Sequence, residues 1–311
     1  MKVAVTGGSG FIGSHVVDKL VAAGHQVVII DRRPHNRTDA VLRDVDITDL
    51  AGLVRAMRGC DAVFHLAGVS NVNEAYADPV ATIDINVTGT ARVWEAARRN
   101  QVGRAILAST VWVYAAAIGD GAAAEDTPLT VTGTEHIYTA SKLAAEVVVT
   151  SFGELYGQPY TILRYGIPFG PRMREELVIP RFLRAALGGE KITINGDGLQ
   201  FRNYVYVEDL ADAHLLLLDG RGENHILNLE GPAPVSIRQV AEVVRSLVDP
   251  DMLIEFVPMR PGDYAGREVS AEKADGLLGW RARTPFEEGM RRYLEWWLAG
   301  TQAAAEGGTG A

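Results

Sequence analysis

The first half of the chain alternates short apolar segments with longer segments of helical periodicity. The apolar segments span residues 3–5, 27–30, 62–66, 105–108 and 160–163. The helical patterns between them cover residues 12–23, 50–57, 80–99 and 137–155. Strands that are apolar at nearly every position are buried on both faces, which requires helices on both sides of a parallel sheet. The pattern therefore predicts a doubly wound α/β fold, whose ligands bind at the carboxyl ends of the strands.

The second half of the chain has a looser pattern. Prolines at positions 168, 171 and 180 and the pair Gly188-Gly189 interrupt it. We expect helices near residues 178–187, 207–218 and 237–247, and strands near 191–194 and 253–257. These elements indicate a first domain over residues 1–164 and a smaller α+β portion over residues 165–299. Residues 300–311, rich in Gly, Ala and Thr, are expected to form a disordered tail.

A glycine-rich loop joins the first predicted strand to the first helix. Gly7, Gly10 and Gly13 are spaced three residues apart, around Phe11 and Ile12. Such spacing lets the backbone approach a pyrophosphate closely, and the amino terminus of the helix supplies N–H donors. A purely structural turn is the alternative. The position between strand and helix favours a dinucleotide-binding, Rossmann-type domain.

The end of the second predicted strand bears on which dinucleotide is bound. Asp31 can accept hydrogen bonds from ribose hydroxyls, which favours NAD. Arg32 and Arg33 follow, and an arginine at this place can instead meet a 2′-phosphate. We expect NAD, because Asp31 would repel that phosphate. Solvent exposure or stacking on adenine is the simpler role for the two arginines.

Charge and cysteine content exclude several classes of function. The 311 residues include 39 acidic and 30 basic ones, giving a net charge of −9, which argues against a general nucleic-acid binder but leaves room for a small local basic site. Cys60 is the only cysteine, which excludes an intrachain disulfide and a multi-cysteine metal site. Met1 leads directly into the first predicted strand, and no apolar run approaches the ~20 residues of a membrane span. We therefore expect a cytoplasmic protein with no metal and no nucleic-acid or membrane partner.

Further motifs follow in order along the chain. They are Asp46-Ile47, His65-Leu66-Ala67-Gly68, Asn86-Val87-Thr88-Gly89-Thr90, Ser109-Thr110 and Tyr138-Thr139-Ala140-Ser141-Lys142. With the glycine loop they resemble the extended short-chain dehydrogenase/reductase family, in its nucleotide-sugar epimerase/dehydratase branch, from Met1 to about Trp297. The resemblance implies an NAD-binding first domain that carries the catalytic residues, and a second portion that mainly binds a nucleotide sugar. The NAD contacts that it implies are Gly7, Gly10, Phe11, Ile12, Gly13, Asp31, Arg32, Asp46, Ile47, Leu66, Ala67, Gly68, Asn86, Ser109, Tyr138 and Lys142.

Tyr138 and Lys142 are four residues apart on a predicted helix and therefore share a face. A free tyrosine, with a pKa of about 10, is a poor base at neutral pH. A nearby ammonium and a positive nicotinamide ring favour the phenolate. We expect Tyr138 to take a proton from a sugar hydroxyl with help from Lys142, and Thr110 to hydrogen-bond the reacting oxygen. An ordinary amphipathic helix face is the alternative for the pair.

The residues after Thr110 narrow the choice of reaction. Dehydratases and decarboxylases of the resembled branch commonly carry acidic residues there, whereas this chain has Val111 and Trp112, which cannot transfer protons. Such a site suits a 4-epimerase, which oxidises C4 of the sugar transiently, lets the keto sugar rotate and returns the hydride to its other face. A keto-sugar reductase needs no more than this and is the main alternative. A non-catalytic dinucleotide sensor is a further one.

Arginines in the second half are candidates for holding the substrate. Arg202 and Arg260 resemble the branch's ligands for the substrate diphosphate, with Asp263 as a ribose or structural partner. Surface ion pairs are the alternative. Arg174 lies where UDP-glucuronate 4-epimerases have an arginine for the C6 carboxylate, and a solvated loop charge is the alternative there. Ile167 departs from the branch, which commonly has a polar residue at that place. The expected substrate pairs are UDP-glucuronate/UDP-galacturonate and UDP-glucose/UDP-galactose.

The helix from residue 80 and the helix of Tyr138 also suggest a homodimer, as in the resembled family. The apolar side chains that could form its interface are Val87, Ala91, Trp94, Ala144, Val148 and Phe152. The same side chains could instead pack within one monomer, so the sequence leaves both arrangements open.

Overall fold

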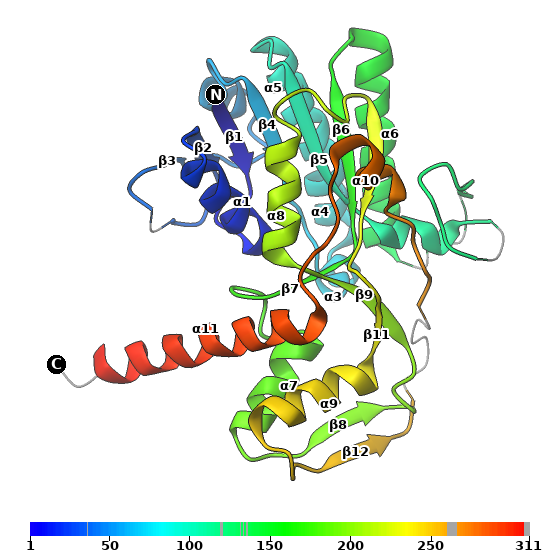
Figure 1. Cartoon of the computed structure of the whole chain (residues 1–311). Coiled ribbons are helices and arrows are strands. Elements are labelled where there is room, and N and C mark those ends of the chain that lie inside the picture. The colour runs from blue at the N-terminus through cyan, green and yellow to red at the C-terminus, as the bar shows by residue number, and fades with distance from the viewer. Residues whose placement is uncertain are drawn as a thin grey trace. The chain divides into compact units, whose positions relative to one another are not determined.

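The computed structural model describes residues 1–35, 37–118, 121–130, 132, 134, 136–259 and 266–307. The chain divides into two compact units, which can be followed along the colours of Figure 1. The first comprises Met1–Tyr165, Leu210–Leu229 and Val269–Arg281, and the second comprises Gly166–Asp209, Glu230–Glu268 and Ala282–Ala311. The chain therefore returns to the first unit twice after leaving it at Tyr165.

A seven-stranded parallel sheet forms the centre of the first unit, in the order β10-β6-β5-β4-β1-β2-β3. The strands are β1 (Lys2–Thr6), β2 (Gln26–Ile30), β3 (Val41–Arg43), β4 (Ala62–His65), β5 (Arg104–Thr110), β6 (Tyr160–Tyr165) and β10 (His225–Leu229). All residues of β4 and β5 are buried. The arrangement confirms the doubly wound α/β fold. The two edge strands, β3 and β10, were not among the predicted elements. In the sequence, β10 comes after a long segment that belongs to the second unit.

Helices cover both faces of this sheet (Figure 1). On one face α2 (Leu50–Ala56), α5 (Thr90–Arg99) and α6 (Ile137–Tyr156) pack side by side. On the other, α1 (Phe11–Ala22) and α8 (Val207–Leu216) are joined by an ion pair between Lys19 and Asp212 at 2.8 Å. The short helix α10 (Glu272–Leu278) packs against β10. Trp94 is wholly buried between the sheet and the first of these layers, so this candidate for a dimer interface packs inside the monomer.

The long helix expected over residues 80–99 consists of three parts. Following α3 (Val72–Ala77), they are α4 (Pro79–Ile83), the π-helical turn η1 (Asp84–Gly89) and α5. Asn86 is buried within the π-helical turn. Gly89 leaves room for Ile47, because a Cβ at that glycine would lie 2.8 Å from Cδ1 of Ile47. Single π-helical turns occur frequently at functional sites, and this one brings Asn86 within hydrogen-bond distance of Ser141 on α6.

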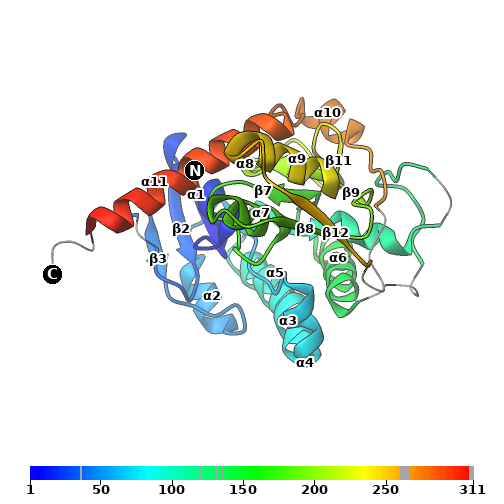
Figure 2. The ribbon, with the colours of Figure 1, turned by 90° about the horizontal axis from the view of Figure 1, so that it is seen from below.

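The second unit contains two small sheets. In the first, β9 (Phe201–Tyr206) pairs parallel with β7 (Ile167–Phe169) and antiparallel with β11 (Pro234–Ser236). The other is the parallel pair β8 (Ile192–Asn195) and β12 (Ile254–Val257). The helices are α7 (Val178–Leu187) and α9 (Ile237–Val248), which pack together, and α11 (Phe286–Gly307), all visible in Figure 2.

The last helix differs from the expected disordered tail. α11 continues through residues 300–307 to Gly307, since alanine and glutamine in this stretch are good helix formers. Residues 308–311 lie outside the described part of the chain. Among the described residues, no helix has both the length and the apolar character needed to cross a bilayer.

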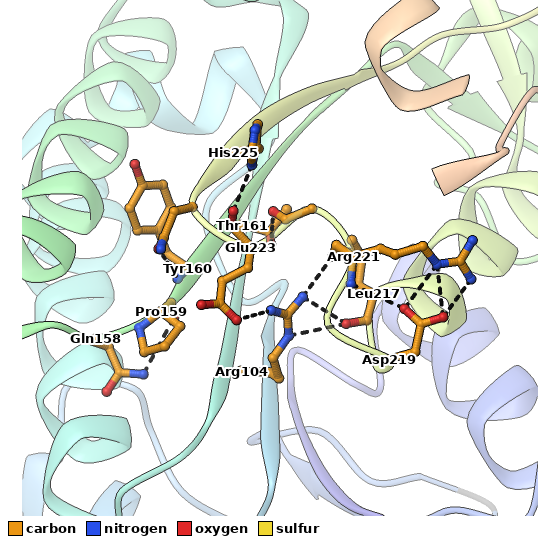
Figure 3. Close-up of polar contacts among 12 residues, drawn as sticks. Arg104, Gln158, Pro159, Tyr160, Thr161, Leu217, Asp219, Arg221, Glu223 and His225 are labelled. Atoms are coloured by element: carbon orange, nitrogen blue, oxygen red, sulfur yellow. Dashed lines mark hydrogen bonds and ion pairs between the residues drawn. The ribbon is translucent and has the colours of Figure 1, made fainter. Parts of the chain in front are cut away.

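Hydrogen bonds from Arg104 join the amino end of β5 to a later segment of the chain, as Figure 3 shows. Its guanidinium donates to the carbonyl of Leu217 at 2.9 and 3.2 Å, to the carbonyl of Arg221 at 2.8 Å and to the carboxylate of Glu223 at 2.8 Å. All three partners lie in the connection between α8 and β10. One buried side chain therefore joins a late segment of the chain to the amino end of a central strand, whereas the glycine loop follows the carboxyl end of β1.

Candidate active site

The glycine loop packs too closely for any other residue. Gly7 has φ +71°, and a Cβ there would lie 2.7 Å from the amide nitrogen of Ala67. A Cβ at Gly13 would collide with the carbonyl oxygen of Gly7. The amide of Gly10 donates to that same oxygen at 2.9 Å, which closes the turn just before α1 begins at Phe11. The loop thus presents bare backbone and a helix amino terminus, which fit the diphosphate of a dinucleotide.

Asp31 lies beside this loop at the end of β2. Its carboxylate accepts the amide of Ser9 at 3.0 Å and the amide of Arg33 at 3.0 Å, and its side chain is 9% exposed. This position suits an acceptor for ribose hydroxyls. Arg32 points to another partner, because its Nη1 pairs with Oδ2 of Asp46 at 3.0 Å. Hydrogen bonds from Thr48, together with Arg32, lower the pKa of Asp46.

A buried polar chain connects β1, β4 and the π-helical turn. His65 contacts Oγ1 of Thr6 through Nδ1 at 2.7 Å and Oγ1 of Thr90 through Nε2 at 3.0 Å. Burial, reinforced by the charge of Lys142, lowers the pKa of His65 to about 3. Thr90 in turn donates to the carbonyl of Asn86 at 2.6 Å. The histidine is therefore neutral and structural, and it shapes the segment Leu66-Ala67-Gly68 that follows it.

Asn86 joins that segment to the helix of Tyr138. Its Oδ1 accepts the amide of Val69 at 2.8 Å, and its Nδ2 donates to the carbonyl of Val69 and to Oγ of Ser141, both at 2.9 Å. Ser141 then donates to the carbonyl of Tyr138 at 2.7 Å. A Cβ at Gly68 would lie 2.9 Å from Oδ1 of Asn86. Asn86 is thus held between the loop after β4 and the first turn of α6.

Two candidate catalytic side chains, Lys142 and Thr110, lie near the carboxyl end of β5. Nζ of Lys142, which is buried, donates to the carbonyl of Ala108 at 3.0 Å. Burial lowers the pKa of Lys142 to about 8, although the charge of Glu146 raises it. Thr110 is buried at the end of β5, and its hydroxyl accepts the amide of Trp112 at 3.2 Å. Tyr138 lies one turn before Lys142 on α6 and is half-buried.

Sequence reasoning missed a buried ion pair behind these residues. Glu146 and Arg164 are each 4% exposed, and Nη2 of Arg164 lies 2.6 Å from Oε2 of Glu146. Ser109, which was expected to contact NAD, donates to Oε1 of Glu146 at 2.5 Å. The only hint in the sequence was that Glu146 follows Lys142 by four residues on the helix.

Two of the arginines expected to hold the substrate, Arg174 and Arg202, belong to the second unit. Nε of Arg174 lies 3.5 Å from Oε1 of Glu176, and its side chain is 35% exposed. Arg202 is on β9, where its Nη1 donates to the carbonyl of Phe201 at 2.6 Å. Arg260 and Asp263 lie outside the described residues.

The fold and the glycine loop together are typical of dinucleotide-binding proteins. Residues 3–229 match the NAD dependent epimerase/dehydratase family, and the chain belongs to that family. NAD is its cofactor. Its relatives include dehydratases and decarboxylases as well as epimerases.

Three relatives illustrate the similarity. The chain is 29% identical over 95% of its length to a trifunctional UDP-glucose 4,6-dehydratase/UDP-4-keto-6-deoxy-D-glucose 3,5-epimerase/UDP-4-keto-L-rhamnose-reductase of Arabidopsis thaliana, and spans 47% of that protein. The UDP-glucose 4-epimerase of Thermotoga maritima, solved with UDP-glucose, has a TM-score of 0.89 at 28% identity, with 97% of this chain and 100% of that one covered. MoeE5, solved with UDP-glucuronic acid and NAD, has a TM-score of 0.85 at 32% identity, with 96% and 100% covered.

Proposed function

We propose that this chain is an NAD-dependent nucleotide-sugar 4-epimerase. The observation that carries the proposal is the segment at the end of β5, where Thr110 is followed by Val111 and Trp112. Neither of these two side chains transfers a proton. With Tyr138 and Lys142 on α6, the set provides one base and one hydroxyl donor. A 4-epimerase needs no more, whereas a dehydratase or decarboxylase uses a further acid or base.

NAD supplies the hydride acceptor and donor for C4 of the sugar. The phenolate of Tyr138 takes the proton of the C4 hydroxyl, and the ammonium of Lys142, one helical turn away, stabilises that phenolate. The hydroxyl of Thr110 hydrogen-bonds the same oxygen and holds it in place. Once the sugar has turned, Tyr138 returns the proton, so these residues end the cycle in the protonation state in which they began.

We further propose a UDP-sugar as the substrate, held through its diphosphate by Arg202 and Arg260, with Asp263 as a ribose or structural partner. Arg174 would read the C6 carboxylate of UDP-glucuronate or UDP-galacturonate. Its ion pair with Glu176 is 3.5 Å long and partly exposed, so a substrate carboxylate could replace that partner with a closer, bidentate one. UDP-glucose and UDP-galactose are the neutral alternative.

Product analysis tests the reaction directly. Purified protein with NAD is incubated separately with UDP-glucose and UDP-glucuronate, and the nucleotide sugars are resolved by chromatography. We expect the 4-epimer of one of them, with no net change in cofactor absorbance. Stoichiometric consumption of added NAD(P)H would instead identify a keto-sugar reductase, and turnover of neither sugar would refute the 4-epimerase. Tyr138→Phe serves as the control, because it should abolish turnover while NAD still binds.

We also propose that the enzyme is a homodimer through α4 and α6, which pack side by side in the first unit. Large apolar side chains on and next to this pair are exposed: Tyr76 by 84%, Val80 by 78%, Val147 by 59% and Leu155 by 72%. A second copy would cover them. Sedimentation of the wild type and of Val80→Glu tests this: a dimer that the charge converts to a monomer is expected, and a monomeric wild type would refute it.

A further inference from the structure

The carboxylate of Glu146 is shared by three elements of the first unit. It projects from α6, accepts the hydroxyl of Ser109 from β5 at 2.5 Å, and accepts Nε and Nη2 of Arg164 from β6 at 3.0 and 2.6 Å. All three side chains are buried. Both oxygens are therefore committed, and the arrangement has little freedom to shift without breaking a charge-assisted hydrogen bond.

Among the described residues, the bond to Ser109 and a bond from Lys142 both join α6 to β5 next to the site. Ser109 directly precedes Thr110, and Glu146 follows Lys142 by one helical turn. Lys142 itself donates to the carbonyl of Ala108 at 3.0 Å. Consecutive residues of the strand are thus bound to consecutive turns of the helix. Because Tyr138 and Thr110 come from these two different elements, their spacing depends on this double attachment.

Further hydrogen bonds support the ion pair between Glu146 and Arg164. Nη1 of Arg164 donates to the hydroxyl of Tyr114 at 2.8 Å, and that hydroxyl donates to Oδ1 of Asn228 on β10 at 2.9 Å. The guanidinium also lies 4.9 Å from the centre of the Tyr114 ring. A buried ion pair by itself contributes little net stability. This one is held in place by Tyr114 and Asn228 and lies next to the site, which suggests that it positions neighbouring residues.

We propose that Glu146 is a positioning residue for the reaction: through Ser109 it sets Thr110 against α6, and through its charge it keeps Lys142 an ammonium. The charged and titratable groups around Lys142 in the described residues support the second part. Glu146 on α6 raises the pKa of the lysine, against burial that lowers it to about 8. His65 on β4 is neutral, since its own pKa is about 3. Arg164 on β6 is the ion-pair partner of the same carboxylate, and Tyr138 lies one turn before Lys142 on α6.

A lysine titration tests the charge without any sugar. The chain has only five lysines, so the side-chain carbons of labelled lysine can be followed by NMR against pH in the NAD-loaded protein, with Lys142→Met to assign the signal. Glu146→Gln should lower the pKa of Lys142. The matched control is Glu223→Gln, which removes the carboxylate partner of the buried Arg104 at the amino end of β5 and should leave the pKa of Lys142 unchanged. An unmoved Lys142 in folded Glu146→Gln would overturn the electrostatic role.

Kinetics test the geometric role, and only this arm rests on the proposed function. Ser109→Ala keeps the ion pair and should lower kcat about tenfold or more, with KM for the sugar nearly unchanged, because small misplacements of reacting groups cost this much. Full kcat in Ser109→Ala would overturn the positioning role.

A double variant keeps the proposal testable if Glu146→Gln does not fold. If Glu146→Gln alone fails to fold, because it leaves Arg164 with an uncompensated buried charge, Glu146→Gln/Arg164→Met removes both charges. It should fold and still show the lowered pKa of Lys142 and the reduced kcat. Recovery of wild-type values in this variant would show that the pair is merely structural.

Discussion

The stability of an Arg104→Met variant measures how much the hydrogen bonds of Arg104 contribute to the free energy of unfolding. These bonds join β5 to the connection between α8 and β10. Methionine keeps much of the apolar stem but removes four hydrogen bonds to Leu217, Arg221 and Glu223. Leu217 is wholly buried, so its carbonyl loses both donors with no water to replace them, at a cost of about 1–3 kcal/mol. Arg221 and Glu223 are exposed enough to regain water. With the lost charge-assisted bonds, we expect the free energy of unfolding to fall by about 2–3 kcal/mol.

Urea unfolding followed by tryptophan fluorescence measures this change. The matched control is Arg92→Met, since Arg92 pairs with Asp84 at 3.2 Å on the surface with its side chain 30% exposed, and such a pair contributes at most about 1 kcal/mol. NAD affinity should remain within about twofold of wild type in both variants, because effects at well-separated sites are independent. An Arg104→Met protein as stable as Arg92→Met would refute the reasoning, and so would a loss of NAD affinity in a protein that is still folded.

Three further predictions concern the site. Gly13→Ala should lower NAD affinity by about tenfold or more, measured by cofactor titration, because a Cβ there meets the carbonyl of Gly7 and displaces the phosphate loop; unchanged affinity would contradict the tight packing. The turnover rate should fall as the pH rises through about 8, because Lys142, whose pKa is about 8, then loses the charge that stabilises the Tyr138 phenolate; a rate still rising above that pH would remove Lys142 from this role. Arg174→Ala should reduce kcat/KM for UDP-glucuronate about a hundredfold and for UDP-glucose little, as expected for loss of a bidentate carboxylate contact; equal effects on the two sugars would mean that Arg174 does not read the carboxylate.

The parallel sheet could be predicted because each of its central strands is marked locally. Runs such as residues 27–30 are apolar at every position, so their burial on both faces can be inferred without knowing their neighbours. The edge strand β10 (His225–Leu229) includes His225 and Asn228, and its place beside β6 depends on a return from the second unit. Nothing in a single segment reveals such a return.

The candidate site divides in the same way. Gly7, Gly13 and Asp31 follow from loop chemistry within a short stretch, and Tyr138 and Lys142 from helical spacing. The ion pair between Glu146 and Arg164 joins residues 18 positions apart on different elements. Arginine in a strand and glutamate on a helix are each ordinary on their own, so only the packed structure identifies them as partners.

The polar residues that lead from the glycine loop to Tyr138 show why the family's motifs occur together. Thr6 binds His65, His65 binds Thr90, Thr90 binds Asn86, and Asn86 reaches Ser141 and so the first turn of α6. Each of these groups is buried, and a buried polar group that loses its partner is costly. A substitution in one motif therefore leaves a buried polar group of the next motif without its partner. The motifs are coupled in this way as well as through the cofactor that they share. The motifs accordingly act as one connected network that places α6 against the loop after β4.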